Sequence, residues 1–338
     1  MFQYRGVVLN RSHASPDFES PDVDADVDAR GIDPPVSEQH NRVVASSSNH
    51  GQTGISAQML RQARKSTRKI ATSHYENFLV ASVLLPKKLR QPFYDVYAFC
   101  RTADDLADES PNTKEALRGL ERFQDQLDAA FAGRPADLLF IALETTIREF
   151  GIPKQPFDDL LDAFRQDQYR SRYASMDELL EYCRRSANPV GNIVLHLGNS
   201  YNDENSVLSD HICTGLQLAN FWQDIARDFA MNRIYVPKEQ MQQFGVKEEM
   251  LGDRVTAEPL RRLLASECER AEKMFHAGLP LSESVQPWLS NDIKLFAHGG
   301  LQTLRAIRRI NYDVLGSRPK VGKLQQFGLV LRALVRRL

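Results

Sequence analysis

Residues 94–110, YDVYAFCRTADDLADES, combine an apolar and aromatic face with a cluster of acidic side chains. The apolar residues recur every three or four positions, which predicts an amphipathic helix. Asp104 and Asp108 lie four residues apart, so their Cβ atoms share one face at a separation of about 5–6 Å. Asp105 points partly away from the face that Asp104 and Asp108 share. The stretch therefore predicts a helix that presents two carboxylates together.

The same spacing recurs in residues 216–229, LQLANFWQDIARDF. Asp224 and Asp228 are again four residues apart, with Asn220 one turn and Gln217 about two turns before Asp224. One helical stripe therefore carries Gln, Asn, Asp and Asp. We expect the two aspartate pairs to lie on two facing helices.

The two pairs require positive charge nearby, because like charges at this spacing destabilise a helix, and more so beside apolar neighbours. Internal ion pairs with Arg101 and Arg227 would account for a single pair. Two copies beside aromatic residues instead favour a metal site. Oxygen ligands without His or Cys suit Mg²⁺, whose coordination is commonly completed by substrate phosphates. The pattern predicts Mg²⁺ bound together with a diphosphate.

A diphosphate also needs hydrogen-bond donors from the protein. The candidates are Ser73, Tyr75, Arg101, Arg233 and the basic stretch 318–323, which contains Arg318 and Lys323. The glycines of GSRPKVGKL lack P-loop spacing, and GxGxxG after a strand, GxSxG, HExxH and ExxH do not occur. These absences argue against nucleotide binding, serine hydrolysis, zinc proteolysis and a di-iron bundle.

Composition limits the partners and the compartment. Of the 338 residues, 42% are hydrophobic, which is enough for a large core. Lys and Arg total 43 against 44 acidic residues, so we expect no nucleic-acid partner. The four cysteines form no CxxC, which suggests reduced thiols, and the longest apolar stretch (78–86) is too short to cross a bilayer. We expect no import signal and a cytoplasmic location.

The chain is expected to consist of a disordered polar tail over 1–58 and one all-α domain over 59–338. The C-terminal stretch 324–338 sets apolar positions against arginines. It would either dock on the core or lie on an anionic membrane surface. Predicted helices cover 75–82, 87–109, 113–132, 136–150, 155–170, 176–184, 189–199, 207–228, 238–244, 256–277, 280–297 and 299–315.

Four segments in the same order carry a resemblance to a known family. They are SHYENFLVASVLLPKKLRQPFYDVYAFCRTADDLADE (73–109), YCRRSANPVGNIVLHL (182–197), GLQLANFWQDIARD (215–228) and NRIYVP (232–237). In these segments the chain resembles the squalene/phytoene synthase family from about residue 66 to its C-terminus. The resemblance is specific because several separated motifs recur together.

The resemblance implies an isoprenoid (terpenoid) synthase fold, a single helical domain around a central cavity. The family's metal ligands match Asp104, Asp108, Asp224 and Asp228, which would bind Mg²⁺ and act in catalysis. Tyr97 and Tyr235 would line the reaction chamber. The residues implied to contact diphosphate are Ser73, Arg101, Gln217, Asn220, Arg318 and Lys323. The implied apolar wall is Phe78, Leu79, Val190, Leu195, Leu218 and Phe221.

Residues 186–191, SANPVG, are the sequence evidence for which reaction of the family the chain catalyses. Many condensing members carry VAGxVG at this place. This segment resembles the bacterial hydroxysqualene synthase branch of hopanoid pathways. That branch implies presqualene diphosphate as substrate, capture of its cation by water, and no NADPH. An ordinary helix break before Pro189 explains the segment equally well. Pathway enzymes upstream and downstream, and the inner face of the membrane, are further partners that the resemblance suggests.

Two alternatives remain open. The first is condensation of two prenyl diphosphates to phytoene, dehydrosqualene or squalene on the same scaffold. The second is a non-catalytic helical assembly protein, for which loss of the metal ligands would be the sign. Both aspartate pairs, Asn220 and Arg101 are present, which favours an enzyme.

Overall fold

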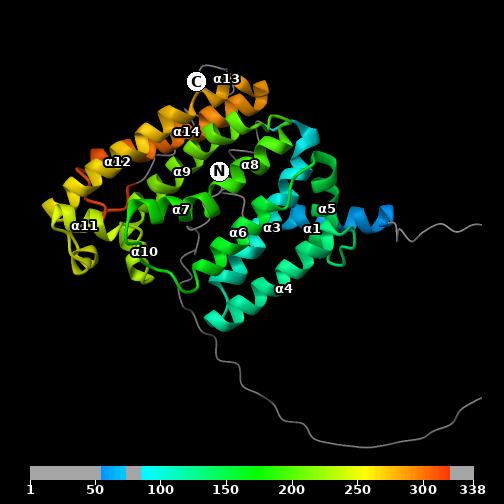
Figure 1. Cartoon of the computed structure of the whole chain (residues 1–338), viewed down its shortest axis with the longest axis horizontal. Coiled ribbons are helices and arrows are strands. Elements are labelled where there is room, and N and C mark those ends of the chain that lie inside the picture. The colour runs from blue at the N-terminus through cyan, green and yellow to red at the C-terminus, as the bar shows by residue number, and fades with distance from the viewer. Residues whose placement is uncertain (1–54, 74–84, 320–338) are drawn as a thin grey trace, which may run out of the picture. The chain divides into compact units, whose positions relative to one another are not determined.

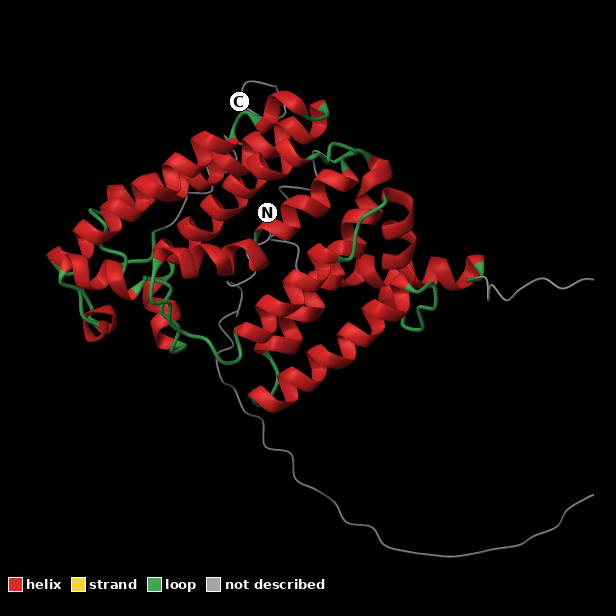
Figure 2. Ribbon diagram, viewed as in Figure 1, coloured by secondary structure: helices red, strands yellow, loops and turns green. Residues whose placement is uncertain are grey.

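The computed structural model describes residues 55–73 and 85–319, and in these ranges every regular element is a helix (Figures 1 and 2). The predicted all-α class is therefore confirmed. The elements are α1 (Ala57–Ser73), η1 (Lys87–Leu89), α3 (Arg90–Asp108), α4 (Thr113–Phe131), α5 (Leu138–Phe150), α6 (Gln155–Gln166), α7 (Met176–Ser186), α8 (Asn188–Leu197), α9 (Asp203–Gln223), α10 (Ile225–Ala230), α11 (Lys238–Phe244), η2 (Glu248–Gly252), α12 (Glu258–Gly278), α13 (Leu281–Ser284) and α14 (Pro287–Arg309).

Side-chain caps fix where several helices begin. The side chains of Asn112, Asp137, Ser175 and Asn202 each accept a backbone N–H from the first turn of the helix that follows. Such caps satisfy donors that the helix itself leaves unpaired. The Asn202 cap starts α9 at Asp203, four residues before the predicted start of that helix.

Two large hydrophobic cores organise the described helices. Side chains of α1, α3, α4, α5 and α6 form the first core, and those of α7, α9, α10, α11, α12 and α14 form the second. Helix α8 joins them, because Val190, Ile193 and Leu197 pack into the first core while Leu195 packs into a smaller cluster with residues of α9 and α14. Figure 1 shows α3 to α6 grouped together and α9 beside α12 and α14.

Helix α1 was not among the predicted helices. Its buried positions are Ala63, Thr67 and Ala71, which give only a weak apolar pattern. Thr67 Oγ1 donates to the buried Asp95 of α3 at 2.6 Å, and Thr146 of α5 donates to the other oxygen of Asp95 at 2.8 Å. A polar contact therefore helps to hold α1, which a search for hydrophobic periodicity does not detect.

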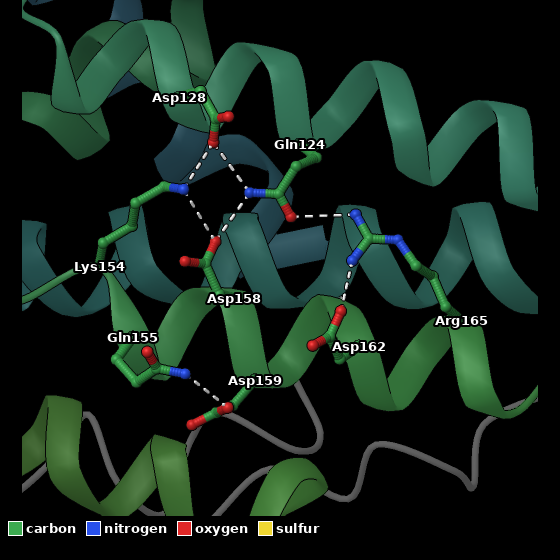
Figure 3. Close-up of polar contacts among 8 residues, drawn as sticks. All are labelled: Gln124, Asp128, Lys154, Gln155, Asp158, Asp159, Asp162 and Arg165. Atoms are coloured by element: carbon green, nitrogen blue, oxygen red, sulfur yellow. Dashed lines mark hydrogen bonds and ion pairs between the residues drawn. The ribbon is translucent and has the colours of Figure 1, made fainter.

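A second polar network joins α4 to α6 (Figure 3). Lys154 Nζ lies 2.8 Å from Asp128 and 3.2 Å from Asp158, and Gln124 donates to Asp158 at 2.7 Å. Arg165 pairs with Asp162 at 2.7 Å. These acidic side chains are already compensated by the protein, so the network acts as a bridge between two helices.

The predicted helix boundary near residue 298 is wrong. Helix α14 runs without interruption from Pro287 to Arg309, and its start coincides with Pro287 in the first turn. Gly300 is a close-packing position: an added Cβ would lie 2.1 Å from Cζ of Phe275 on α12. The glycine therefore allows two helices to approach, and does not end one.

Among the described helices, none is long and apolar enough to cross a membrane. The predicted helix over 75–82, the C-terminal stretch 324–338 and nearly all of the predicted tail lie outside the described residues. All four cysteines are buried and free of disulfides.

Replacing Gly300 with alanine tests the packing of α14. The new methyl group would collide with the buried ring of Phe275, and overpacking of this kind costs about 1–3 kcal/mol. We expect Gly300→Ala to lower Tm by several degrees in thermal unfolding followed by circular dichroism. Gly299→Ala is the matched control, because nothing lies within 4 Å of its added Cβ. Alanine there should leave Tm unchanged or raise it; equal loss in both variants would contradict the packing role.

Candidate functional site

The first aspartate pair lies in the last two turns of α3. Asp104 is buried, and Arg101 Nη1 lies 3.5 Å from its Oδ2. The same guanidinium pairs with Asp105 and, at 3.4 Å, with Glu109. Arg101 therefore provides the counter-charge that the sequence predicted for this helix.

Tyr97 lies one turn before Arg101 on the same face of α3 and is buried. Desolvation raises the pKa of its phenol, and the neighbouring Arg101 partly offsets that effect. The hydroxyl therefore stays protonated as a neutral hydrogen-bonding group at neutral pH. The structure brings Tyr97 together with Arg101 and Asp104.

The second aspartate pair lies where α9 gives way to α10. The single predicted helix over 207–228 is interrupted at Asp224, whose φ of −108° and ψ of 15° depart from helical values. The N–H of Asp228 still bonds to the carbonyl of Asp224 at 2.9 Å, so the four-residue relation survives. Both aspartates are buried.

Arg318 provides the counter-charge at Asp224. Its Nε and Nη2 bind the two carboxylate oxygens at 2.6 and 3.0 Å, a bidentate geometry. Gln223 donates to the carbonyl of Pro319 at 2.7 Å and so fixes the chain beside the pair. Arg227, named above as an internal ion-pair partner only in the alternative to a metal site, is not among the arginines that pair with these aspartates within the described ranges. Arg318, predicted to contact diphosphate, reaches Asp224 through tertiary folding.

Arg233 connects the two aspartate helices. It follows α10, and its Nη2 lies 2.9 Å from Asp108 Oδ1 on α3. Asp167, at the C-terminal end of α6, is close enough for Arg233 to lower its pKa. Burial is the larger effect and raises the pKa of Asp167 to about 7. Arg233 therefore lies among carboxylates from separate elements.

An aromatic cluster borders the second pair. The ring of Tyr235 stacks on Phe221 with centroids 3.9 Å apart and planes 7° apart. Tyr182 of α7 contacts both rings, and Tyr173 stacks on Tyr235. A small pocket, partly open to solvent, adjoins this cluster. It is lined by Phe221, Ile225, Asp228, Arg233, Ile234, Tyr235, Val236 and Leu251.

The other residues predicted to bind diphosphate or to line the cavity lie in different parts of the described structure or outside it. Ser73 is exposed at the end of α1, where its hydroxyl donates to the carbonyl of Ile70 at 2.9 Å. Gln217 is half-buried on α9. Tyr75 and Lys323 lie outside the described residues, as do Phe78 and Leu79. The other predicted wall residues divide between clusters: Val190 in the first core, Leu195 in the small cluster, and Leu218 and Phe221 in the second core.

The segment that was expected to distinguish the reaction lies between the two cores. Asn188 is buried, and its Oδ1 accepts a hydrogen bond from Thr214 of α9 at 3.0 Å. The Ser186 hydroxyl oxygen is buried, and no described side chain or backbone group bonds to it. Asn188 therefore has a structural partner, whereas Ser186 presents a free hydroxyl.

The donor set fits a hard cation that retains water. Among the described residues, no three His, Cys, Asp or Glu side chains gather into a group that could hold a metal ion alone. Each site would therefore rest on two carboxylates, as Mg²⁺ sites completed by phosphate oxygens commonly do. Asn220 adds an oxygen: its Oδ1 is buried without a hydrogen-bond partner among the described residues, one turn before Asp224.

Sequence reasoning missed Asp167 and Tyr182. Tyr182 Oη donates to Asp167 Oδ2 at 3.0 Å, beside Arg233. Tyr182 opens the motif at 182–197, so its position in that motif was an available signal. Asp167 lies in the segment QDQYRSRY (166–173) at the end of α6, and a polar segment between helices is a common place for functional residues.

Comparison with known proteins agrees with this geometry. The chain is 34% identical over 222 residues to hydroxysqualene synthase of Rhodopseudomonas palustris, covering 64% of this chain and 74% of that protein. It is 30% identical over 271 residues to phytoene synthase of Arthrospira platensis, covering 75% and 86%. A crystal structure of squalene synthase HpnC from Alicyclobacillus acidocaldarius is 42% identical, with a TM-score of 0.73 over 75% of this chain and 96% of that one.

The similarity to the solved structure gives the described helices the all-α isoprenoid synthase fold that the resemblance implied. The family model for squalene/phytoene synthase matches residues 71–325, which is more than half of the chain and includes both aspartate pairs. Sequence motifs, fold and site geometry thus lead to one assignment. The chain belongs to the squalene/phytoene synthase family.

Proposed function

We propose that the chain is a Mg²⁺-dependent enzyme that converts presqualene diphosphate and water to hydroxysqualene and diphosphate. The observation that carries the proposal is the pairing of two two-aspartate sites, in which Asp104, Asp224 and Asp228 are buried, with three arginines, Arg101, Arg233 and Arg318. Such a site matches a metal-bound diphosphate in charge and in ligand type. The hydroxysqualene synthase and HpnC relatives support the choice of reaction.

In this proposal the chain's own residues hold the leaving group. Asp104, Asp108, Asp224 and Asp228 would hold Mg²⁺, which would supply positive charge to the departing diphosphate. Arg101, Arg233 and Arg318 would turn from the carboxylates towards the phosphate oxygens and donate charge-assisted hydrogen bonds. The protein then exchanges one set of ionic partners for another, without burying a bare charge.

The aromatic cluster would act on the carbocation. The carbon–oxygen bond breaks, and its electron pair leaves with the diphosphate. The faces of Phe221, Tyr235 and Tyr182 would stabilise the positive carbon and exclude bulk water. One water then bonds to that carbon and gives its proton to the released diphosphate. No reductant is required, which agrees with the expectation that NADPH is not used.

The Ser186 hydroxyl is a candidate for holding that water. Ser186 lies one turn after Tyr182 on α7, and Asn188 holds the same segment against α9 through Thr214. The hydroxyl is therefore carried by the surface that also carries the Tyr182 ring. This placement favours water capture over formation of a hydrocarbon.

The second candidate function is condensation of two prenyl diphosphates, which the 30% identical phytoene synthase favours. The same aspartates and arginines would serve that reaction, so the site alone does not separate the two. A non-catalytic assembly role is not favoured, because all four predicted metal ligands are present beside compensating arginines. Peripheral binding to the inner face of a membrane would suit either water-insoluble product.

Alanine replacements test the metal ligands. We expect Asp104→Ala and Asp224→Ala each to lower the rate of diphosphate release from presqualene diphosphate by at least about 100-fold, since each removes charge stabilisation at the leaving group. The measurement is steady-state diphosphate release with Mg²⁺, accompanied by circular dichroism to show that the helices persist. Asp159→Ala is the control, because Asp159 lies on α6 and bonds only to Gln155 in Figure 3. Near-normal turnover in either ligand variant would exclude the metal assignment.

Product analysis tests the reaction. Purified protein with Mg²⁺ should convert presqualene diphosphate to hydroxysqualene without NADPH, as detected by gas chromatography with mass spectrometry. In ¹⁸O-labelled water the label should enter the product hydroxyl. Farnesyl and geranylgeranyl diphosphate should give no condensed product. A C30 or C40 hydrocarbon from these substrates, with no hydroxysqualene from presqualene diphosphate, would establish the second candidate instead.

A further inference from the structure

Asp167 is a half-buried residue whose carboxylate the proposed reaction does not use. It follows the last residue of α6, and its N–H caps that helix by bonding to the carbonyl of Ala163 at 3.0 Å. Its Oδ2 accepts the hydroxyl proton of Tyr182 at 3.0 Å. Arg233 and Asp228 are the charged groups closest to it in effect, the first favouring and the second opposing its ionisation. Asp167 therefore adjoins both the aromatic cluster and the second aspartate pair.

Backbone pairing places the segment that follows Asp167 beside the segment that contains Arg233. The segment after α6 runs beside the segment after α10: Ile234 N donates to Ser171 O at 2.9 Å, and Lys238 N donates to Tyr173 O at 2.9 Å. Arg172 adds a hydrogen bond from its Nη1 to the carbonyl of Asn232 at 2.7 Å. These bonds flank Arg233 on both sides along the chain. Arg233 is thus held beside the segment that follows Asp167.

Arg233 and a bound Mg²⁺ would compete for the same carboxylate, that of Asp108. Its guanidinium is largely buried and pairs with Asp108, which is also a proposed Mg²⁺ ligand. A cation at Asp108 would compete for the same oxygens and repel the guanidinium. A buried guanidinium without an anionic partner is costly. The guanidinium then needs other anionic partners, which the phosphate oxygens of the diphosphate and a second carboxylate within reach would supply together.

We propose that Asp167 is a positioning residue that receives Arg233 when Mg²⁺ and diphosphate occupy Asp108. In that state Arg233 is held between Asp167 and the phosphate oxygens, while Tyr182 keeps the Asp167 carboxylate oriented. The inference rests on the proposed Mg²⁺–diphosphate site. It assigns to Asp167 an effect on metal affinity that acts through Arg233.

The test measures metal binding without turnover. The full chain is heated with saturating inorganic pyrophosphate at about pH 8, where the Asp167 carboxyl is mainly ionised. The quantity compared is the Mg²⁺ concentration that gives half of the thermal stabilisation. We expect Asp167→Asn to raise that concentration about tenfold, since one charge-assisted bond is lost. Asp167→Glu should restore most of the affinity.

Asp162→Asn is the matched control, because Asp162 lies one turn or more before Asp167 on α6 and pairs with Arg165 at the surface (Figure 3). It should leave the Mg²⁺ concentration unchanged. Arg233→Gln supplies the decisive background: with the guanidinium removed, adding Asp167→Asn should have no further effect. Tm without Mg²⁺ is recorded for every variant. A variant that folds poorly is thereby recognised, and the comparison among the remaining variants still stands.

Each result has a distinct meaning. Unchanged or tighter Mg²⁺ binding in Asp167→Asn would overturn the role of Asp167 while leaving the metal site intact. An equal loss in the Arg233→Gln background would show that Asp167 acts on the metal directly and not through Arg233, which also overturns the inference. If the wild-type chain shows no Mg²⁺-dependent stabilisation with pyrophosphate, the proposed metal site itself fails.

Discussion

Compensation of buried carboxylates is the constraint on which the site depends. Asp104, Asp224 and Asp228 are nearly inaccessible to solvent, and such charges are costly unless they are paired. Arg101 comes from the same helix, whereas Arg233 and Arg318 arrive from later segments of the chain. The ion pairs therefore tie local helices to tertiary contacts made by segments far along the chain.

In the proposed reaction the arginines would serve the site both with and without its ligands. They pair with the carboxylates as the structure shows, and with a cation and a diphosphate bound they would pair with the phosphate oxygens. Because the arginines would change partners and stay paired, the bound state would require no large rearrangement of the helices. Arg233 differs from the other two arginines, because carboxylates on two elements, α3 and the end of α6, are available to it.

Local features of the sequence predicted most of the helices and both aspartate pairs, since a four-residue spacing depends only on helix geometry. The errors occurred where tertiary packing decides. Helix α1 is held by Thr67 and Asp95, Gly300 accommodates a ring from another helix, and Asp224 interrupts its helix while Arg318 holds its side chain. Asp167 and Tyr182 gain their significance only from each other and from Arg233. No pattern within a short window contains those relations.

The pairing of Asp224 with Arg318 has a consequence for the nascent chain. The two residues are 94 positions apart, and the second core includes residues up to Val314. During synthesis the carboxylate of Asp224 stays solvated and without its bidentate partner until residue 318 has emerged from the ribosome. Burial of that charge depends on Arg318, so the docking of α9 relies on a residue that is synthesised after every helix of the first core.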